Sequence, residues 1–530
     1  MPRLLVVTAA VAALASPALA VIDNSFITSF KPKGVPYGSQ AVFTDTFEVN
    51  GVSQTVPFRK LLSVDQKPPY GGTWGIKPTG SSSAKPDFVS LMPHSNGYVY
   101  SAQHFEDNAG SLYMSQLVQD PATGELFPTA TMPIDFKAVG GTTRPCSGSV
   151  TPWNTHLSSE EKTPDGRNNE KISDLLSTVY RGNSSAYSAY RYGHPIEVGV
   201  TASGYPRVVA KHYALARLSY EMAYVMPDKK TTYLMSDKDN SPMMMFVADK
   251  PEDLTAGNLF TAKLTQTSSA NGGAFSIKWL PMGHATKGEI EALVEGGIRF
   301  SDMFESTSGS SGSCPAGFSS SNAGDYGFEC LKVKPGMEMA ASRLESYRYA
   351  GVIGGTTELN KMEGVTFHAS SNSLFMASSY VRRGMTSSSE YDRGTANDMT
   401  LPGNECGCVF RLKVDPKTYI AADFVAEVCG STSGSCSSRG LANPDNLNLL
   451  GNTLLVAEDT SRTPAQLWAY DITSKTLTSM AVVPNGAEAT GAYVSEAIGD
   501  YVYVTVVAQH PDSERAFTGY WAINVKAHRA

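Results

Sequence analysis

The chain has few charged residues and no excess of basic ones. Asp, Glu, Lys and Arg make up 18% of its 530 residues, and 50 acidic against 43 basic side chains leave a formal net charge of −7. The low charge, together with 10% aromatic residues, excludes a disordered protein. The acidic balance argues against a protein that binds nucleic acid by neutralising phosphates, so we expect no nucleic-acid partner.

Several common signatures of nucleotide-binding and hydrolytic sites are also missing. The sequence contains no Walker loop, no Rossmann fingerprint and no His-Glu-x-x-His motif. It has no Gly-x-Ser-x-Gly elbow in a strand–turn–helix setting, because Gly309-Ser-Ser-Gly312 lies in a Ser/Gly-rich loop and lacks the spacing. A nucleophilic serine triad is therefore not expected.

After the first twenty residues, no hydrophobic run is long enough to span a membrane. Met1–Ala20 combines one positive charge, at Arg3, with an apolar run and a final Ala-Leu-Ala, the pattern that signal peptidases cleave. The alternative is a membrane anchor, but the run is shorter than the roughly 20 residues that cross a bilayer. We expect a secretory signal, followed by a single domain over 21–530 that is secreted, or periplasmic in a bacterium, and monomeric.

Secretion makes the cysteine count informative, since an oxidising compartment would pair the thiols. Six of the seven cysteines lie between Cys314 and Cys436, and Cys146 stands alone in the first half of the chain. We expect three disulfides in the C-terminal half, with a connectivity that the spacing does not reveal. Cys146 is then a free thiol, either a small buried hydrophobe or a metal ligand.

Abundant Gly, Ser, Thr and Tyr favour an all-β chain with many turns. Short β-rich runs recur that end in an acidic or small polar residue, such as Thr232–Asp237 and Asn452–Asp459. Their irregular spacing favours a β-propeller, expected to have six blades, with loop and helical insertions; a β-sandwich is the alternative. One helix is expected over Thr286–Gly297, and the Ser/Gly tract Ser306–Ser321 is expected to be a disulfide-stapled surface insertion.

The segment Arg144–Glu161 has the densest chemistry in the chain. It places a thiol at Cys146, an imidazole at His156 and two adjacent carboxylates within 16 residues. A soft thiolate beside hard carboxylates can hold a transition metal next to a hard cation. The alternative is a Pro/Trp-rich turn with solvated charges, and the unpaired cysteine favours the metal site.

Other acidic residues lie at strand ends or in tight turns. Glu221 has hydrophobic neighbours on both sides, where a carboxylate is costly unless it is neutralised or binds a cation. The others are Asp237, Asp239, Glu363, Asp445 and Glu488. Each alone is typical of a surface turn, but strand ends converge in a propeller, so together they indicate clustered hard cations. We expect His156 and His510 to be structural.

The residues around Cys146 resemble the signature of secreted PhoX-type alkaline phosphatases. The resemblance starts with Pro-Cys-Ser-Gly-Ser-Val-Thr-Pro-Trp-Asn-Thr-His-Leu-Ser-Ser-Glu-Glu and extends from about residue 100 to 512. Further blocks in the family's order are Tyr233–Asp237, Met244–Asp249, Leu254–Phe260, Lys361–Gly364, Cys406–Arg411, Asn443–Asn446, Leu455–Thr460 and Gly486–Gly491.

The resemblance implies a β-propeller that holds a cluster of Fe³⁺ and Ca²⁺ ions and hydrolyses small phosphate monoesters. Cys146 matches the iron-ligating thiolate of the family. The carboxylates that match its acidic ligand positions are Glu161, Glu221, Glu363, Asp445 and Glu488, and Asp237 lies in a further acidic block of the family.

Lys361 and Glu363 are the implied catalytic residues, and Lys361 departs from the family pattern. Better-studied members carry an arginine two residues before the carboxylate that Glu363 matches, where it contacts phosphate. A lysine attracts phosphate as a point charge but lacks the two-pronged guanidinium. We therefore expect an altered substrate geometry and rate.

Two other functions are compatible with a secreted propeller. A calcium-dependent lactonase or phosphotriesterase would need calcium but neither iron nor a thiolate. A non-catalytic binding module would retain calcium for stability and show no turnover.

Overall fold

The computed structural model describes residues 19–310, 312–388, 390–392, 397–431, 435–460 and 464–529. The expected secretory signal, Met1–Ala20, lies outside these residues except for its last two, and so does Ser311 of the expected surface insertion. Within the described ranges, no helix is long and apolar enough to cross a membrane.

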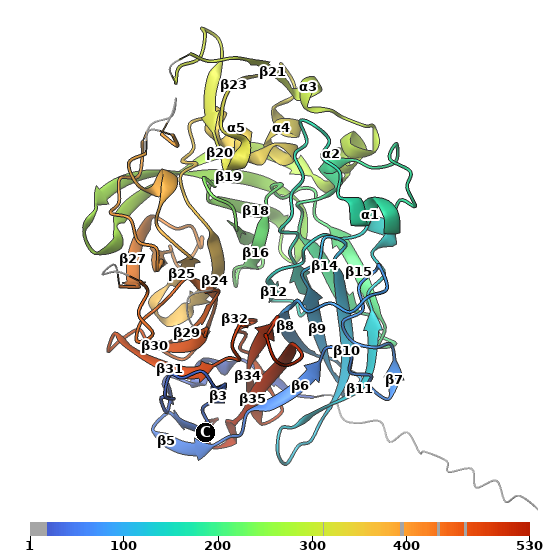
Figure 1. The fold of residues 1–530 in the computed structure, drawn as a ribbon, viewed down its shortest axis with the longest axis vertical. Coiled ribbons are helices and arrows are strands. Elements are labelled where there is room, and N and C mark those ends of the chain that lie inside the picture. Colours follow the sequence, from blue (N-terminus) through green and yellow to red (C-terminus); the bar gives the residue numbers. More distant parts are fainter. Residues whose placement is uncertain are drawn as a thin grey trace, which may run out of the picture.

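Most of the regular secondary structure is β-strand, and the large sheets are arranged in a ring (Figure 1). One sheet has the order β7 (Tyr70–Gly71), β11 (Leu126–Pro133), β10 (Ser111–Gln119), β9 (Val99–Phe105) and β8 (Pro86–Pro93). The next has the order β12 (Gly148–Val150), β13 (His156–Ser158), β14 (Ile196–Val200) and β15 (Pro206–Lys211). Pairing in both is antiparallel, apart from the parallel pair of β7 and β11.

A larger sheet joins two groups of strands through a long hairpin. Its order is β16 (Tyr220–Val225), β17 (Thr231–Ser236), β18 (Met244–Lys250), β19 (Asp253–Ser268), β20 (Ala274–Thr286), β27 (Asp423–Cys429), β26 (Cys408–Lys413), β25 (Ser373–Ser378) and β24 (Met362–His368). The hairpin of β19 and β20 links the groups, because Ala274–Ser276 pairs with Asp423–Val425. Since two groups share one sheet, the count of six blades stays a prediction.

The remaining large sheets combine strands from both ends of the chain, which closes the ring (Figure 1). One has the order β28 (Pro444–Leu450), β29 (Thr453–Glu458), β30 (Gln466–Asp471), β31 (Thr476–Val482) and β3 (Val42–Phe43). The other has the order β1 (Val21–Ile22), β33 (Ala497–Ile498), β34 (Tyr501–Gln509), β35 (Phe517–Asn524) and β6 (Arg59–Ser63), with β32 (Glu488–Thr490) also on β34.

The first strands of these sheets lie against one another around the middle of the ring. β8 contacts β12, β12 contacts β16, β16 contacts β24 and β24 contacts β28, while β34 contacts β8 and β32 contacts β29. Apolar side chains fill the spaces between neighbouring sheets; Leu455 of β29, Val504 of β34 and Trp521 of β35, for example, belong to one buried cluster. This closed, propeller-like ring confirms the predicted all-β fold and excludes the two-sheet sandwich.

Short elements lie outside the ring. Two small sheets contain β2 (Phe30–Pro32), β4 (Thr46–Val49) and β5 (Val52–Thr55), and β21 (Phe304–Thr307), β23 (Phe328–Val333) and β22 (Ser319–Asn322). The α-helices are α1 (Ser173–Thr178), α2 (Lys287–Glu295), α3 (Phe300–Met303), α4 (Glu338–Leu344) and α5 (Ser346–Val352). The 3₁₀ turns are Asn24–Phe26, Lys137–Val139, Ala189–Arg191, Ala270–Gly272, Gly324–Tyr326, Ala369–Ser371, Arg383–Met385 and Lys526–His528.

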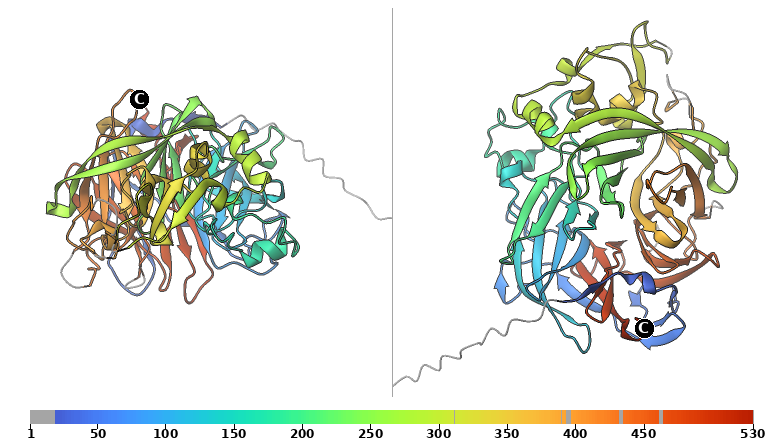
Figure 2. Two further views of the ribbon diagram at one scale, coloured as in Figure 1. Left: turned by 90° about the horizontal axis from the view of Figure 1, so that it is seen from above. Right: turned by 180° about the vertical axis from the view of Figure 1, so that it is seen from behind.

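The helical insertion between β20 and β24 forms one end of the molecule (Figures 1 and 2). Its first helix, α2, confirms the helix predicted over Thr286–Gly297. Thr286 caps it by accepting a hydrogen bond from the Glu289 N–H, and the Glu289 carboxylate accepts one from the Thr286 N–H.

The structure confirms the expected three disulfides in the C-terminal half of the chain. Cys314 pairs with Cys330, Cys406 with Cys436 and Cys408 with Cys429, and Cys146 is free.

Candidate metal centre

Four strands at the middle of the ring begin in the same way, with an acidic residue in second position. These residues are Asp87 of β8, Glu221 of β16, Glu363 of β24 and Asp445 of β28. In each strand the pairing register shifts between the first and the fourth residue, across the acidic position. Such bulges re-aim side chains, so the repeated irregularity is a shared way of placing carboxylates.

The approach of β24 to β28 brings two of these carboxylates together. Gly364 follows Glu363, and a Cβ atom at this position would lie 2.4 Å from the backbone nitrogen of Leu447 and 2.8 Å from the carbonyl oxygen of Asp445. Only glycine allows two backbones to approach so closely. The residue after Glu363 therefore helps to determine how near Glu363 lies to Asp445.

Carboxylate oxygens of Glu221, Glu363 and Asp445 lie within 4.8 Å of one another, and the three residues are 1%, 3% and 5% exposed. Burial raises the pKa of each carboxyl group well above its ordinary range, to about 7 for Asp445, and neighbouring acids raise it further. Three buried carboxylates without compensating charge are unfavourable. This group therefore has the donor chemistry that hard divalent cations require.

The free thiol of Cys146 belongs to the same cluster. Cys146 lies two residues before β12. Burial raises the pKa of its thiol most, and the negative charges of Asp87, Glu221 and Glu161 raise it further. Its backbone N–H donates a 2.9 Å hydrogen bond to Ser159 Oγ, just beyond β13. The hairpin of β12 and β13 thus holds a soft sulfur donor among carboxylates.

Two buried histidines contact the backbone of Cys146, His104 directly and His156 through His104. The carbonyl oxygen of Cys146 lies 2.6 Å from His104 Nδ1, and His104 Nε2 lies 2.5 Å from His156 Nε2. His156 Nδ1 lies 2.8 Å from Ser90 Oγ. Burial lowers the pKa of His104 to about 4 and that of His156 well below its ordinary value, so both rings are neutral. His156 therefore has a structural position, as we expected.

The other predicted ligands surround the central group. Glu161 lies three residues beyond β13, Asp237 follows β17 and Glu488 begins β32; all three are partly buried. Burial and the charges of Glu106 and Asp237 raise the pKa of Glu161. Burial and the charges of Asp459 and Asp445 raise that of Glu488. The structure gathers the seven predicted ligands at one place, and their roles as ligands remain predictions.

Two basic side chains point into the acidic cluster. Lys361 Nζ contacts Asp237 and lies 3.3 Å from Glu363 Oε1. Arg144 Nη1 lies 3.5 Å from Glu161 Oε1 and 3.9 Å from Glu106 Oε1. Both residues have left-handed backbones, with φ of 42° at Lys361 and 39° at Arg144.

Sequence reasoning missed three acidic residues near this cluster. Asp87 accepts hydrogen bonds from Gln509 Nε2 at 2.8 Å and Thr490 Oγ1 at 3.3 Å. Glu106 lies beside Arg144, and Asp459 follows β29 close enough to raise the pKa of Asp445. A signal for Asp87 was present, since Pro86-Asp87 opens a strand as Pro444-Asp445 does.

Asn446 connects two of the carboxylates. Its Nδ2 lies 3.3 Å from Glu221 Oε1 and 3.1 Å from Asp445 Oδ1, while its Oδ1 accepts hydrogen bonds from Thr490 Oγ1 and the Gly491 backbone. With its own oxygen fixed in this way, the amide orients both acids.

Two residues singled out in the sequence lie at the edge of the site. Asp239 accepts a 2.8 Å hydrogen bond from the hydroxyl group of Tyr380 and forms an ion pair with Arg383. His510 is exposed, and its Nε2 lies 3.7 Å from Glu488 Oε2. Its Nδ1 lies 2.9 Å from the Gly486 carbonyl oxygen.

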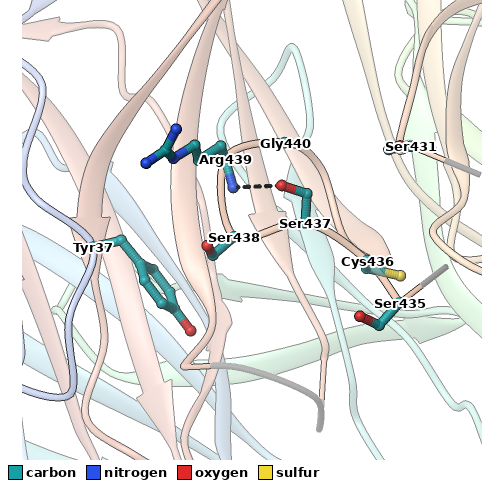
Figure 3. A pocket seen from close by; sticks show the side chains of 8 residues that line it. All are labelled: Tyr37, Ser431, Ser435, Cys436, Ser437, Ser438, Arg439 and Gly440. Atoms are coloured by element: carbon teal, nitrogen blue, oxygen red, sulfur yellow. Dashed lines mark hydrogen bonds between the residues drawn. The ribbon is translucent and has the colours of Figure 1, made fainter. Parts of the chain in front are cut away.

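A surface cavity of about 650 Å³ has a different chemistry (Figure 3). It is lined by Tyr37, Ser431, Ser435, Cys436, Ser437, Ser438, Arg439 and Gly440. None of these lining residues is acidic, so the cavity lacks the carboxylates that a hard cation needs.

Comparison with known structures supports the fold. The chain is similar to Pseudomonas fluorescens PhoX in complex with vanadate, a transition state analogue, at 15% identity, with a TM-score of 0.60 over 94% of this chain and 98% of that one. Weaker matches include a putative 6-phosphogluconolactonase from Bacteroides fragilis (10% identity, 86% and 95% coverage, TM-score 0.33) and the Pseudomonas aeruginosa periplasmic gluconolactonase PpgL (10%, 86% and 96%, 0.33). At these identities the likeness concerns the fold alone.

Comparison by sequence identifies the family. No curated protein matches the chain. The family model for alkaline phosphatase PhoX matches residues 105–512, which include the acidic cluster except Asp87. The chain therefore belongs to the PhoX family of alkaline phosphatases and is a phosphoric ester hydrolase.

Proposed function

We propose that this chain is a secreted hydrolase of phosphate monoesters whose acidic centre holds iron and calcium ions. The observation that carries the proposal is the buried group of Glu221, Glu363 and Asp445 with the free thiol of Cys146 beside it. A phosphate monoester is a compact dianion, and a cluster of carboxylates would repel it unless cations reverse the local charge.

The donor set fits two kinds of metal ion. Cys146 offers a soft sulfur ligand, which suits iron, and it would share that ion with neighbouring carboxylates. The oxygen ligands available for calcium are those of Glu161, Glu221, Glu363, Asp445, Glu488 and Asp237. Bound ions of this kind neutralise charge on the phosphoryl oxygens and lower the pKa of a coordinated water.

The protein's own groups orient the ligands and attract the substrate. Asn446 sets the directions of the Glu221 and Asp445 carboxylates, and the neutral histidine pair fixes the backbone of Cys146. Lys361 places a positive charge beside Glu363 at the partly exposed side of the cluster, where it attracts a phosphate dianion.

Secretion is part of the proposal. Met1–Ala20 has the composition of a signal peptide, and three disulfides suit a protein that matures in an oxidising compartment. N-terminal sequencing of the exported protein should give a chain that begins at Val21.

The function is tested by hydrolysis of p-nitrophenyl phosphate, with bis(p-nitrophenyl) phosphate, paraoxon and a γ-lactone as competing substrates. We expect fastest turnover of the monoester. Cys146→Ser and Glu363→Gln should each reduce kcat/KM by at least about 100-fold, because the metal ions supply several kcal/mol of transition-state stabilisation. Glu305→Gln, an exposed acid of β21 paired with Lys332, is the control.

Three results would overturn the proposal. Faster cleavage of the lactone or of paraoxon would indicate the calcium-dependent hydrolase. No turnover of any substrate by a folded, metal-loaded protein would indicate a binding module. Full activity in Cys146→Ser would show that the thiolate has no role in catalysis.

A further inference from the structure

Arg144 differs from the buried arginines of this protein in how its charge is satisfied. Arg348 is buried and makes close contacts with Glu329 at 2.6 Å and Glu345 at 2.7 Å. The side chain of Arg144 is 37% exposed, and the carboxylate oxygens nearest its guanidinium lie at 3.5 and 3.9 Å. Charge-assisted hydrogen bonds are normally 2.7–2.9 Å long. Arg144 therefore has donor capacity that its neighbours do not use.

The unused capacity lies on one side of the guanidinium. Both contacts involve Nη1, and among the described residues Nε and Nη2 have no hydrogen-bond partner. Nε and Nη2 form a fork whose spacing matches two oxygens of a phosphate or carboxylate group.

The backbone holds Arg144 firmly in an unfavourable conformation. At φ 39° it occupies the left-handed region, which costs a residue with a side chain of the order of 1 kcal/mol. Its N–H donates to the Asp107 carbonyl oxygen at 2.7 Å, and its own carbonyl oxygen accepts from the Glu161 N–H at 2.9 Å. Glycine would fit this conformation without strain, but the chain has an arginine there, two residues before Cys146.

Lys361 is arranged in the same way on another side of the cluster. It also has a left-handed backbone, and its ammonium group lies between Asp237 and Glu363. The charge of Glu161 acts on both Arg144 and Lys361, so the two basic groups share this acidic neighbour.

We propose that Arg144 binds the phosphoryl group of the substrate through its Nε and Nη2 atoms. It supplies the two-pronged contact that Lys361, as a point charge, cannot make. The inference rests on the proposed function and assigns a substrate-binding residue to it. Arg144 selects substrates whose anionic group presents a pair of oxygens to the fork, as a phosphate monoester does.

The test compares Arg144→Lys and Arg144→Ala with the metal-loaded wild type. Inorganic phosphate is the probe, with binding measured by calorimetry and inhibition measured against p-nitrophenyl phosphate. Arg59→Lys is the matched control, because the side chain of Arg59, on β6, is 32% exposed and pairs with Glu125, just before β11. Iron and calcium content is measured for every variant.

We expect Arg144→Lys to weaken phosphate binding and raise KM by at least about 10-fold with unchanged metal content, since a two-pronged charged contact is lost. Arg144→Ala should lose at least about 100-fold, and millimolar guanidinium chloride should recover part of it. Unchanged phosphate binding in Arg144→Lys would overturn the inference. So would loss of metal in Arg144→Ala with full recovery in Arg144→Lys, since Arg144 would then act only as a counter-ion of Glu106 and Glu161.

This test separates the inference from the function on which it rests. If wild-type protein hydrolyses monoesters but Arg144→Lys binds phosphate normally, only the role of Arg144 fails. If wild-type protein hydrolyses no monoester, the proposed function fails, and calorimetry with phosphate still decides whether Arg144 binds the anion.

Discussion

The ammonium nitrogen of Lys361 lies 3.3 Å from Oε1 of Glu363, the acid that stands two residues further along the chain. The same nitrogen contacts Asp237, so one basic side chain offsets the charge of two acids in a cluster that otherwise needs external cations. The left-handed backbone of Lys361, just before β24, places its ammonium group back beside Glu363.

Replacing Lys361 tests whether its charge serves the substrate. Lys361→Met should lower kcat/KM for p-nitrophenyl phosphate by at least about 10-fold, because a charge-assisted contact is lost. Lys361→Arg should lower KM, because a guanidinium can contact two phosphoryl oxygens. Lys332→Met removes a lysine on β23 and is the control. Steady-state kinetics on metal-loaded protein decides, and wild-type kcat/KM in Lys361→Met would contradict the prediction.

The pair His104 and His156, which fixes the backbone of Cys146, should affect the affinity for iron. His156→Phe breaks the contact chain from Ser90 through His104 to the Cys146 carbonyl oxygen. Loss of such supporting contacts typically costs 10–100-fold in metal affinity, so iron should transfer to a chelator faster by about that factor. His368→Phe alters a histidine at the opposite end of β24 from Glu363, where it contacts Ser370 and Ser371, and should release iron as wild type does. Equal release rates in the two variants would refute this role.

After chelation of its metal ions, the protein should become less stable as the pH rises above neutral. Burial and mutual repulsion raise the folded-state pKa of Glu221, Glu488 and Asp445, to about 7 for Asp445. Between the unfolded value near 4 and the raised value, the folded state binds more protons, so stability falls as pH rises. Metal-free protein should therefore melt at a lower temperature at about pH 8.5 than at about pH 7.

This pH window excludes the histidines, so the fall in stability comes from the buried acids and the buried Cys146 thiol. The buried His104 has a pKa of about 4, and an unfolded histidine is also largely neutral above pH 7, so the histidines contribute little there. Metal-loaded protein should show a much smaller change, because cations satisfy the carboxylates. Chelated protein that melts higher at pH 8.5 than at pH 7 would disprove the prediction.

The disulfides should differ in their effect on activity. The Cys406 carbonyl oxygen accepts a 3.0 Å hydrogen bond from the Asn443 N–H, and Asn443, with φ 52°, leads into Pro444 and Asp445. Replacing Cys406 and Cys436 by serine should therefore lower calcium affinity and kcat/KM as well as stability, the latter by about 3–4 kcal/mol. Replacing Cys314 and Cys330, in the insertion, should lower stability alone. Equal activities in the two double variants would contradict this prediction.

The fold and much of the site could be predicted because the signals are local. Glu221, Glu363 and Asp445 each stand at the start of a β-rich run, and strands of a propeller converge at their ends. The free Cys146 followed from an odd cysteine count in a chain predicted to be secreted. Helix α2 followed from its Thr286 cap and glycine stop.

Other features depend on contacts between distant segments. Glu106 lies in a loop typical of an exposed turn, and it joins the cluster because Arg144 folds against it from 38 residues further along the chain. The pairing of β20 with β27, more than 130 residues apart, merges two groups of strands into one sheet. No local pattern encodes such pairings, nor the connectivity of the disulfides.

Elemental analysis of purified protein tests the central claim most directly. The account predicts both iron and calcium in the wild-type protein, and loss of iron with retention of calcium in Cys146→Ser. Calcium without iron in the wild type, or iron retained in full by Cys146→Ser, would contradict it.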